Sequence, residues 1–450
     1  MKPSDKIKLK IESFDVNGYG VAKHDNKVVF VMGAMENEEV IAEIVNVHKK
    51  YAFAEVVEIL TKSKDRIEPK CPYYEYCGGC DMMHMTYDCE TKIKHNKVSQ
   101  TLKSVIRKDF DVSKVVTNDR INGYRNKVMI PFTKDEEDGV LYGFYEKKSH
   151  NIVSIDKCLI SNDLSNEITQ FVCKYLNVMN VSIYNEEHHK GLFKELMIRY
   201  TALDEYMVVL VVTKEHDFSR LVSYLTEIFP QIKSIYLNVN SDKTNVVLSN
   251  NYKLLYGNKT ITEDILGLKF NVSPASFMQV NHDQCEKLYQ KAIDLANLDS
   301  SMNVIDAYCG MGSITLNIAK NVNKVYGIEV VEDAITNANE NKKLNNIDNA
   351  HFICGKCEDE IVKLVNKDKI DVIFFDPPRK GCDQKFLDTV IKMQIPKIIY
   401  ISCGISSLAR DIKYLLQFGY EVEEIVPVDL FSRTNHIETV ATMVLKDKAK

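Results

Sequence analysis

The chain lacks a long apolar segment. Its longest run of nearly pure apolar residues, from Met207 to Val212, is far shorter than the roughly 20 residues that a membrane-spanning helix needs. The first residues, from Met1 to Lys6, also lack the apolar core of a secretory signal. We therefore predict a cytoplasmic protein without a membrane partner, in which the 12 cysteines are more often ligands, nucleophiles or core residues than disulfides.

An excess of positive charge is missing as well. The chain has 58 Lys and Arg residues against 63 Asp and Glu residues, a net charge of −5 at pH 7. This overall charge does not indicate nucleic-acid binding, which calls for clustered cations. Residues 61–130, the basic belt, nevertheless hold 14 Lys and Arg against 9 Asp and Glu. On charge alone, the belt fits a solvated surface as well as an RNA-binding surface.

Internal repeats and low-complexity segments are absent too. The composition, 45% hydrophobic and 27% charged, is that of a folded globular protein, and 450 residues correspond to about three domains. Alternating apolar and polar positions between turns predict a small antiparallel β-barrel over residues 1–60. Residues 61–265 predict a mixed α+β central domain. Residues 266–450 alternate strands and helices and predict a doubly wound, Rossmann-like α/β domain.

A glycine-rich turn in the last region indicates a nucleoside cofactor. The segment from Asp306 to Gly312 (DAYCGMG) follows a short strand and precedes a helix, so free N–H groups can approach a ligand. Glu329 ends the next strand, where a carboxylate can bind ribose hydroxyls. Thr315 stands where a dinucleotide fingerprint would have its third glycine. We therefore predict S-adenosylmethionine rather than NAD.

Two further strand ends carry reactive side chains. Asp376 begins an Asp-Pro-Pro-Arg loop, and Cys403 follows the next strand beside the start of a helix, which favours thiolate formation. A thiolate that adds to C6 of a pyrimidine makes C5 nucleophilic, and a base must later remove the C5 proton. Glu438 and His436, at the entrance to a final strand, are the candidate bases.

Together these residues resemble the RNA 5-methyluridine methyltransferases, in particular the bacterial 23S rRNA (uracil-5-)-methyltransferases. The resemblance covers essentially the whole chain, because the N-terminal barrel resembles a TRAM domain, an RNA-binding module. It rests on an ordered set of motifs: Ser276 to Asn281, Asp306 to Gly312, Glu329, Asp376 to Arg379, Ser402-Cys403, Leu408 to Asp411 and His436 to Val440.

The resemblance implies a role for each matching residue. Cys403 would be the nucleophile and Glu438 the base, acting on a uridine extruded from its stack. Contacts to S-adenosylmethionine would come from Gln279, Tyr308, Glu329 and Asp376. The chain departs from the family at two positions: Gly404 replaces a common Asn or Asp, and Ile405 replaces a common Pro.

A separate cysteine pattern predicts a metal site. Cys71, Cys77 and Cys80 have the spacing of metal ligands, with two glycines that allow a tight wrap. The candidates for the fourth ligand are Cys89, His84 and the distant Cys158. Both zinc and an iron–sulfur cluster suit such a site. The resemblance implies a [4Fe–4S] cluster that uses Cys158, with zinc as the lesser alternative. We expect the cluster to hold the basic belt against the central domain.

The sequence thus predicts an S-adenosylmethionine-dependent enzyme that methylates C5 of a uridine in 23S rRNA, with no obligate protein partner evident. Three alternatives stay open. The first is the same chemistry on the T-loop of tRNA, which is less expected. The second is amino-methyltransfer through the Asp-Pro-Pro loop, which would not need Cys403. The third is an RNA-binding protein with an inactive methyltransferase domain.

Overall fold

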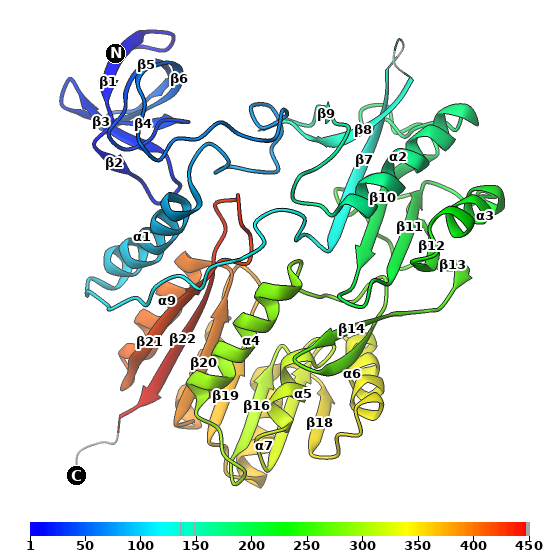
Figure 1. Ribbon diagram of the computed structural model, residues 1–450. Coiled ribbons are helices and arrows are strands. Elements are labelled where there is room, and N and C mark those ends of the chain that lie inside the picture. Colours follow the sequence, from blue (N-terminus) through cyan, green and yellow to red (C-terminus); the bar gives the residue numbers. More distant parts are fainter. Residues whose placement is uncertain (136, 138, 148, 447–450) are drawn as a thin grey trace.

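The structure is a computed structural model that describes residues 1–135, 137, 139–147 and 149–446. Its N-terminal part is a six-stranded sheet that curls into a small barrel (Figure 1), with the strand order β1-β5-β6-β4-β3-β2. The strands are β1 (Lys6–Lys10), β2 (Ser13–Phe14), β3 (Gly20–His24), β4 (Lys27–Met32), β5 (Glu39–Val47) and β6 (Tyr51–Thr61). Small and β-branched residues alternate into its core, as with Val29, Val31, Ala52 and Ala54.

A long helix follows the barrel. Helix α1 (Tyr87–Ile106) begins at Thr86, whose side chain accepts a hydrogen bond from the Cys89 N–H. Its residues fall within the predicted central domain, 61–265. In the structure the helix lies beside the C-terminal sheet, and Val98 and Leu102 join that sheet's hydrophobic core. Helix α1 therefore connects the barrel directly to the C-terminal domain.

The central part is a seven-stranded sheet with the order β13-β12-β11-β10-β7-β8-β9. Helices α2 (Asp163–Val178) and α3 (Ser219–Ile228) pack on one face, and Met197, Val209 and Val211 pack toward the C-terminal domain. The strands are β7 (Lys127–Asp135), β8 (Gly139–Tyr145), β9 (Ile152–Ser154), β10 (Phe193–Tyr200), β11 (Tyr206–Val212), β12 (Ile232–Val239) and β13 (Tyr252–Gly257). The predicted mix of strands and helices in this region is therefore present.

The C-terminal part is the predicted doubly wound domain. A hairpin of β14 (Ile261–Ile265) and β15 (Leu268–Val272) leads into a sheet with the order β18-β17-β16-β19-β20-β22-β21. Parallel pairing joins β18 through β20, whereas β22 is antiparallel to both of its neighbours. The strands are β16 (Asn303–Ala307), β17 (Lys324–Glu329), β18 (Ala350–Cys354), β19 (Val372–Phe375), β20 (Lys397–Ser402), β21 (Tyr420–Val428) and β22 (Glu438–Leu445).

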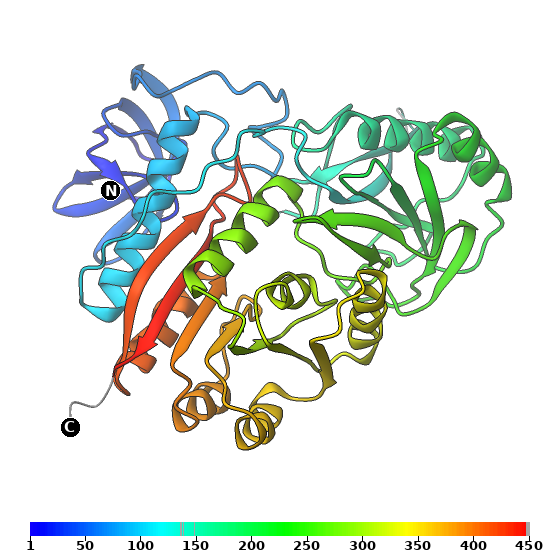
Figure 2. The same ribbon diagram turned by 60° about the horizontal axis from the view of Figure 1, so that its bottom comes forward.

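Helices cover both faces of this sheet (Figure 2). Helices α4 (His282–Ala296), α5 (Ser313–Ala319) and α6 (Glu332–Leu344) lie on one face, and α7 (Cys357–Lys367), α8 (Gln384–Lys392) and α9 (Ile405–Leu416) lie on the other. Strand β19 serves both cores, since Ile373 and Phe375 join one hydrophobic cluster and Val372 and Phe374 join the other. Its continuous apolar run follows from this double burial. None of the described helices is long and apolar enough to cross a membrane.

Candidate active site

Four side chains predicted to act on ligands lie at one edge of the C-terminal sheet. Tyr308, Glu329, Asp376 and Cys403 end or directly follow β16, β17, β19 and β20. Because these strands are parallel and in level register, their carboxyl ends meet at the same edge. The strand order reverses between β16 and β19, which is where open α/β sheets bind ligands.

The loop after β16 has backbone φ angles that residues with a side chain seldom adopt. Tyr308, Gly310 and Gly312 have φ values of 65°, 54° and 83°. A Cβ on Gly310 would meet no atom within 4 Å, so the backbone there borders open space. A Cβ on Gly312 would lie 2.6 Å from the Phe352 ring, so no larger residue fits. The loop thus presents bare backbone to a ligand.

The Glu329 carboxylate spans the gap between two strand ends. It accepts hydrogen bonds from the backbone N–H groups of Val330 at 2.8 Å, Val331 at 3.1 Å and Gly310 at 3.3 Å. These contacts hold the carboxylate over the glycine-rich loop. Ribose hydroxyls of a nucleoside can be bound at this position.

One carboxyl group at this edge received no role in the sequence analysis. Asp306 is 2% exposed, and it accepts a hydrogen bond from the Thr315 hydroxyl. Burial raises the pKa of Asp306 to about 7. Asp306 therefore ties the end of β16 to helix α5, which also explains why Thr315 rather than glycine stands at that position. The sequence signal was its place as the first residue of the glycine-rich motif.

Gln279 approaches the same edge from the loop before α4. The side chain is 6% exposed, and its backbone carbonyl accepts a hydrogen bond from the Asn126 side chain at 3.1 Å. Arg199, which is fully buried on β10, donates to the Ser276 carbonyl at 2.7 Å. The central domain therefore holds the loop that carries Gln279, with Phe277 left 73% exposed beside it.

Cys403 and Glu438 lie side by side at adjacent strand ends. In the antiparallel pairing of β20 and β22, Ser402 is opposite Thr439, so the next position of each strand carries Cys403 and Glu438. Glu438 is 2% exposed. Its Oε2 atom has no hydrogen-bond partner among the described residues. An unpaired oxygen at this depth is available to a ligand beside the thiol.

The charges around Cys403 oppose ionisation in the free protein. Burial, followed by Glu438 and Asp376, raises the pKa of the Cys403 thiol to about 11, while Arg379 acts in the opposite direction. This differs from the expectation based on the helix N-terminus, because burial disfavours the charged thiolate and the two nearby carboxyl groups add to that effect. Burial and Asp376 likewise raise the pKa of Glu438 well above its usual range. Burial and Asp306 raise the pKa of Asp376 to about 7.

Helix α9 fixes the Asp-Pro-Pro-Arg loop through a hydrogen bond to the loop's backbone. The Ser407 hydroxyl lies 2.9 Å from the Arg379 carbonyl oxygen. A Cβ on Gly404 would lie 2.6 Å from that same oxygen. The glycine at position 404 therefore leaves room for the Arg379 backbone to approach the nucleophile loop closely.

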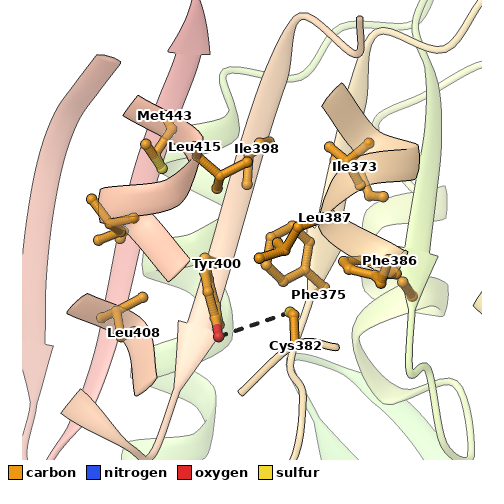
Figure 3. Packing of buried hydrophobic residues seen from close by; sticks show 14 of the residues in the cluster. Ile373, Phe375, Cys382, Phe386, Leu387, Ile398, Tyr400, Leu408, Leu415 and Met443 are labelled. Carbon is orange, nitrogen blue, oxygen red and sulfur yellow. Dashed lines mark hydrogen bonds between the residues drawn. The ribbon is translucent and has the colours of Figure 1, made fainter. Parts of the chain in front are cut away.

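The end of the same loop is anchored in the core. Asp411 accepts hydrogen bonds from the Cys382 N–H at 2.9 Å and from the Tyr400 hydroxyl at 2.8 Å. Figure 3 shows the Cys382 thiol directed at the Tyr400 hydroxyl, which is 3.8 Å away. Arg410 donates to the Cys382 carbonyl at 3.2 Å. Arg410 and Asp411, quoted in the sequence analysis only as part of a motif, therefore position the loop that carries Asp376.

The four cysteines of the metal pattern meet in one place. Cys71, Cys77, Cys80 and Cys158 line a single cavity of about 470 Å³, between the loop after the barrel and the central sheet. Burial, with the charges of Cys158, Cys77 and Cys71, raises the pKa of the Cys80 thiol far above its usual value. Thiolates at these positions would repel one another, so a bound cation would stabilise their charged forms.

The other two candidates for the fourth position lie elsewhere. Cys89 packs among Met35, Met82 and Met85, and His84 contacts the Tyr74 hydroxyl through Nδ1 at 2.5 Å. Within the described part of the chain, no three His, Cys, Asp or Glu side chains are grouped closely enough to hold a single metal ion. The four thiols thus share a cavity without converging on one point, and the described structure shows no formed metal site.

The cysteine loop also contacts the segment that carries Glu438. Just after Cys80, the Asp81 N–H donates to the Arg433 carbonyl at 2.9 Å, and the Asp81 carboxylate accepts from the Asn435 N–H at 3.1 Å. The same cavity reaches Arg379 and His436. Two hydrogen bonds and a shared cavity therefore connect the cysteine loop to the segment before Glu438.

A buried ion network supports this contact. Lys94, on helix α1, is fully buried and lies 2.8 Å from Glu90 and 2.6 Å from Asp429. Glu90 in turn accepts from the Arg433 N–H at 2.7 Å. Although Lys94 belongs to the basic belt, its burial excludes it from an RNA-binding surface, and its role is to fix α1 to the segment before β22.

Comparison with known proteins places these motifs in a family. The family model described as tRNA (uracil-5-)-methyltransferase matches residues 86–447. A TRAM domain model matches residues 4–57, which are the barrel. An uncharacterized RNA methyltransferase of Oceanobacillus iheyensis is 40% identical over 445 residues, covering 97% of this chain and 96% of that protein. One of Clostridium tetani is 39% identical over 447 residues, covering 98% and 97%.

A solved structure is similar over nearly the whole chain. It is the Pyrococcus abyssi tRNA (uracil-54, C5)-methyltransferase in complex with S-adenosyl-L-homocysteine. The TM-score is 0.78 at 26% sequence identity, and the match covers 97% of this chain and 99% of the other. The similarity thus extends through the barrel, the central sheet and the C-terminal domain.

Proposed function

Since this chain belongs to the tRNA (uracil-5-)-methyltransferase family and is an S-adenosylmethionine-dependent RNA methyltransferase, we propose that it methylates C5 of a uridine in 23S rRNA. The observation that carries the proposal is the pairing of Cys403 with Glu438 at adjacent strand ends. Amino-methyltransfer would need neither side chain there. A thiol beside a buried carboxyl group is what C5 chemistry requires.

The cofactor would bind across the carboxyl ends of β16, β17 and β19. Glu329 would hold the ribose hydroxyls, Tyr308 and Gln279 would border the nucleoside and methionine parts, and Asp376 would stand near the reactive end. The bare backbone at Gly310 and the reach of Glu329 over it support this fit. When bound, S-adenosylmethionine supplies an electrophilic methyl group.

The reaction steps follow from the placement of the two residues. The Cys403 thiolate adds to C6 of the uracil, and the electron pair of the C5–C6 bond becomes available at C5. C5 takes the methyl group, with S-adenosyl-L-homocysteine as the leaving group, and becomes tetrahedral. The Glu438 carboxylate then removes the C5 proton, the C5–C6 double bond forms again, and the C6–S bond breaks to release the Cys403 thiolate. The raised pKa of Glu438 makes its carboxylate a stronger base for this step.

Arg379 supports the ionised forms of both groups. Its positive charge lowers the pKa of Cys403 and that of Glu438, against the larger effect of burial. The hydrogen bond from the Ser407 hydroxyl to the Arg379 carbonyl oxygen fixes the backbone that carries this cation. We therefore assign to Arg379 the electrostatic support of the thiolate and to Ser407 the positioning of Arg379.

The proposal also specifies the class of RNA substrate. The combination of a TRAM barrel with four cysteines around one cavity favours large-subunit rRNA. A second candidate is the T-loop uridine of tRNA, which the similarity to the archaeal tRNA methyltransferase over 97% of this chain supports. Both substrates use the same chemistry, and the protein would act on either in the cytoplasm.

The decisive experiment is transfer of a labelled methyl group to unmodified rRNA and tRNA from a strain without this protein, followed by nucleoside analysis. We expect label in 5-methyluridine of 23S rRNA. Label in tRNA alone would select the second candidate, label in another nucleoside would favour amino-methyltransfer, and RNA binding without label would favour an inactive binder. The Cys403→Ser variant should lose activity, and RNA containing 5-fluorouridine should trap a covalent adduct with the unchanged protein only.

We further propose that Cys71, Cys77, Cys80 and Cys158 hold a [4Fe–4S] cluster, with zinc as the lesser alternative. The support for this proposal is that four cysteines with the spacing of metal ligands line one cavity, and four thiolates suit either an iron–sulfur cluster or zinc. Iron, sulfide and zinc contents of protein purified without oxygen test this. Cys158→Ala should lose the metal, whereas Cys89→Ala should keep it. Equal metal content in both variants would contradict the proposed ligand set.

A further inference from the structure

The outer face of the barrel carries a cluster of aromatic rings. Phe30 on β4 and Phe53 on β6 have ring centroids 5.5 Å apart, and Tyr51 lies 6.0 Å from Phe30 and 5.7 Å from Phe53. The His48 ring stacks on Tyr51 with centroids 4.5 Å apart. These four residues form what we call the aromatic face. Tyr51 is 38% exposed, so its ring is open to a ligand.

The barrel does not need these rings for its core. Along β6, Ala52 and Ala54 flank Phe53, and these small side chains are fully buried in the interior. The parallel pairing of β4 with β6 sets Phe30 beside Phe53 on the outside. Aromatic rings placed together on a solvent-facing sheet surface are the arrangement that proteins use to stack unpaired bases.

Cations border the aromatic face. Lys27, Lys49 and Lys50 lie at the ends of β4 and β6, and the Lys27 ammonium group donates to the His48 carbonyl at 3.0 Å. Over the ranges that the structure describes, none of the three has a carboxylate within 4.0 Å. Lys49 and Lys50 are exposed. Unneutralised ammonium groups next to rings complement a strand of phosphates with its bases turned toward the protein.

The loop after Cys80 contacts both the barrel and the segment before Glu438. A Cβ on Gly18, in the turn between β2 and β3, would lie 3.0 Å from the Met82 side chain. Asp81 accepts a hydrogen bond from the Asn435 N–H at 3.1 Å, three residues before Glu438. The barrel is therefore tied to the loop that borders the active site.

We propose that the aromatic face binds an unpaired segment of the RNA substrate outside the active site, with a base stacked on Tyr51. The inference rests on the chain acting on RNA, and it adds to the proposed function the contact that the barrel makes. Recognition is by stacking and backbone charge, so it selects single-stranded over duplex RNA without reading a particular base.

The absence of tryptophan from the chain provides a direct test. Tyr51→Trp introduces one indole on the aromatic face, and its fluorescence should be quenched by poly(U) and much less by the poly(A)·poly(U) duplex. The matched control is Tyr256→Trp, at a residue 43% exposed on β13 of the central sheet, where no quenching is expected. Equal quenching in both variants, or none with poly(U), would overturn the proposal.

Affinity gives a second measurement. Tyr51→Ala should raise the Kd for poly(U) by about tenfold and leave S-adenosyl-L-homocysteine binding intact, whereas Tyr256→Ala should change neither. An unchanged Kd in Tyr51→Ala would contradict the inference. The inference would also be contradicted if the indole emission of the Tyr51→Trp protein shifted only with protein concentration. A second copy of the chain would then cover the aromatic face. Quenching by RNA without 5-methyluridine formation would instead reject the proposed reaction and keep the RNA contact.

Discussion

The Ser407 hydroxyl is 2.9 Å from the carbonyl oxygen of Arg379, and it crosses the space that a side chain at position 404 would fill. Position 404 is one at which the resemblance leads us to expect a departure from the family. With glycine there, a residue one helical turn later reaches the Arg379 backbone. The segment after the nucleophile and the Asp-Pro-Pro-Arg loop are thereby joined.

We expect Ser407→Ala to lower kcat/KM by about fivefold, which corresponds to one hydrogen bond of about 1 kcal/mol. Gly404→Ala should lower it more, because its Cβ would lie 2.6 Å from a backbone oxygen and displace the loop. Ser406→Ala, at an exposed position of the same helix, is the control. Steady-state methylation rates give the comparison. Equal rates for all three variants would show that the hydrogen bond from Ser407 does not position Arg379.

The reactivity of Cys403 should depend on pH throughout the neutral and mildly alkaline range. Because its thiol pKa is about 11, the neutral form dominates below that pH, and each pH unit gained multiplies the thiolate fraction by about ten. Alkylation by iodoacetamide without RNA, followed by peptide mass spectrometry at Cys403, measures this. A plateau near neutral pH would mean that the thiol is already ionised. Arg379→Gln should slow alkylation at every pH, because it removes the cation that favours the thiolate.

Removal of the Lys94 ammonium group should destabilise the fold strongly. Lys94→Met would leave the Glu90 and Asp429 carboxylates buried without their partner, which costs about 3–5 kcal/mol. Lys92→Met, at a residue whose side chain is 69% exposed on the same helix, should cost little. Urea unfolding of both variants measures the difference. Similar midpoints would indicate that the network contributes no net stability.

Cofactor affinity should depend on Glu329. In Glu329→Gln the side chain keeps its shape but loses the charge that strengthens hydrogen bonds to ribose hydroxyls, so the Kd for S-adenosyl-L-homocysteine should rise by about tenfold. Glu332→Gln, an exposed neighbour in α6, is the control. Isothermal titration calorimetry determines both values, and an unchanged Kd in Glu329→Gln would place the ribose elsewhere.

The sequence predicted the parts of the site that lie at strand ends. Glu329, Asp376 and Cys403 each follow a continuous apolar run, and parallel strands must bring such positions to one edge. The fold class and the family were confirmed on the same motifs. Residue roles carried by the resemblance remain proposals, although the structure places these side chains together.

Long-range features were not predictable from local patterns. Helix α1 has no strong apolar stripe, because its buried surface includes Glu90 and Lys94, whose partners lie more than 300 residues away. The insertion of β22 between β20 and β21 likewise leaves no trace in the order of the chain. The raised pKa of Cys403 depends first on burial and then on carboxyl groups from two other strands, and neither is visible in the local sequence beside the helix start.

The contact between Lys94 and Asp429 also constrains how the protein is made. During synthesis the barrel and α1 leave the ribosome 335 residues before their partner, so Lys94 and Glu90 stay solvated until the last strands emerge. Helix α1 can dock only after the C-terminal sheet exists, whereas the barrel has a core of its own. Shortened products therefore retain an undocked helix, which cellular proteases can distinguish from the finished enzyme.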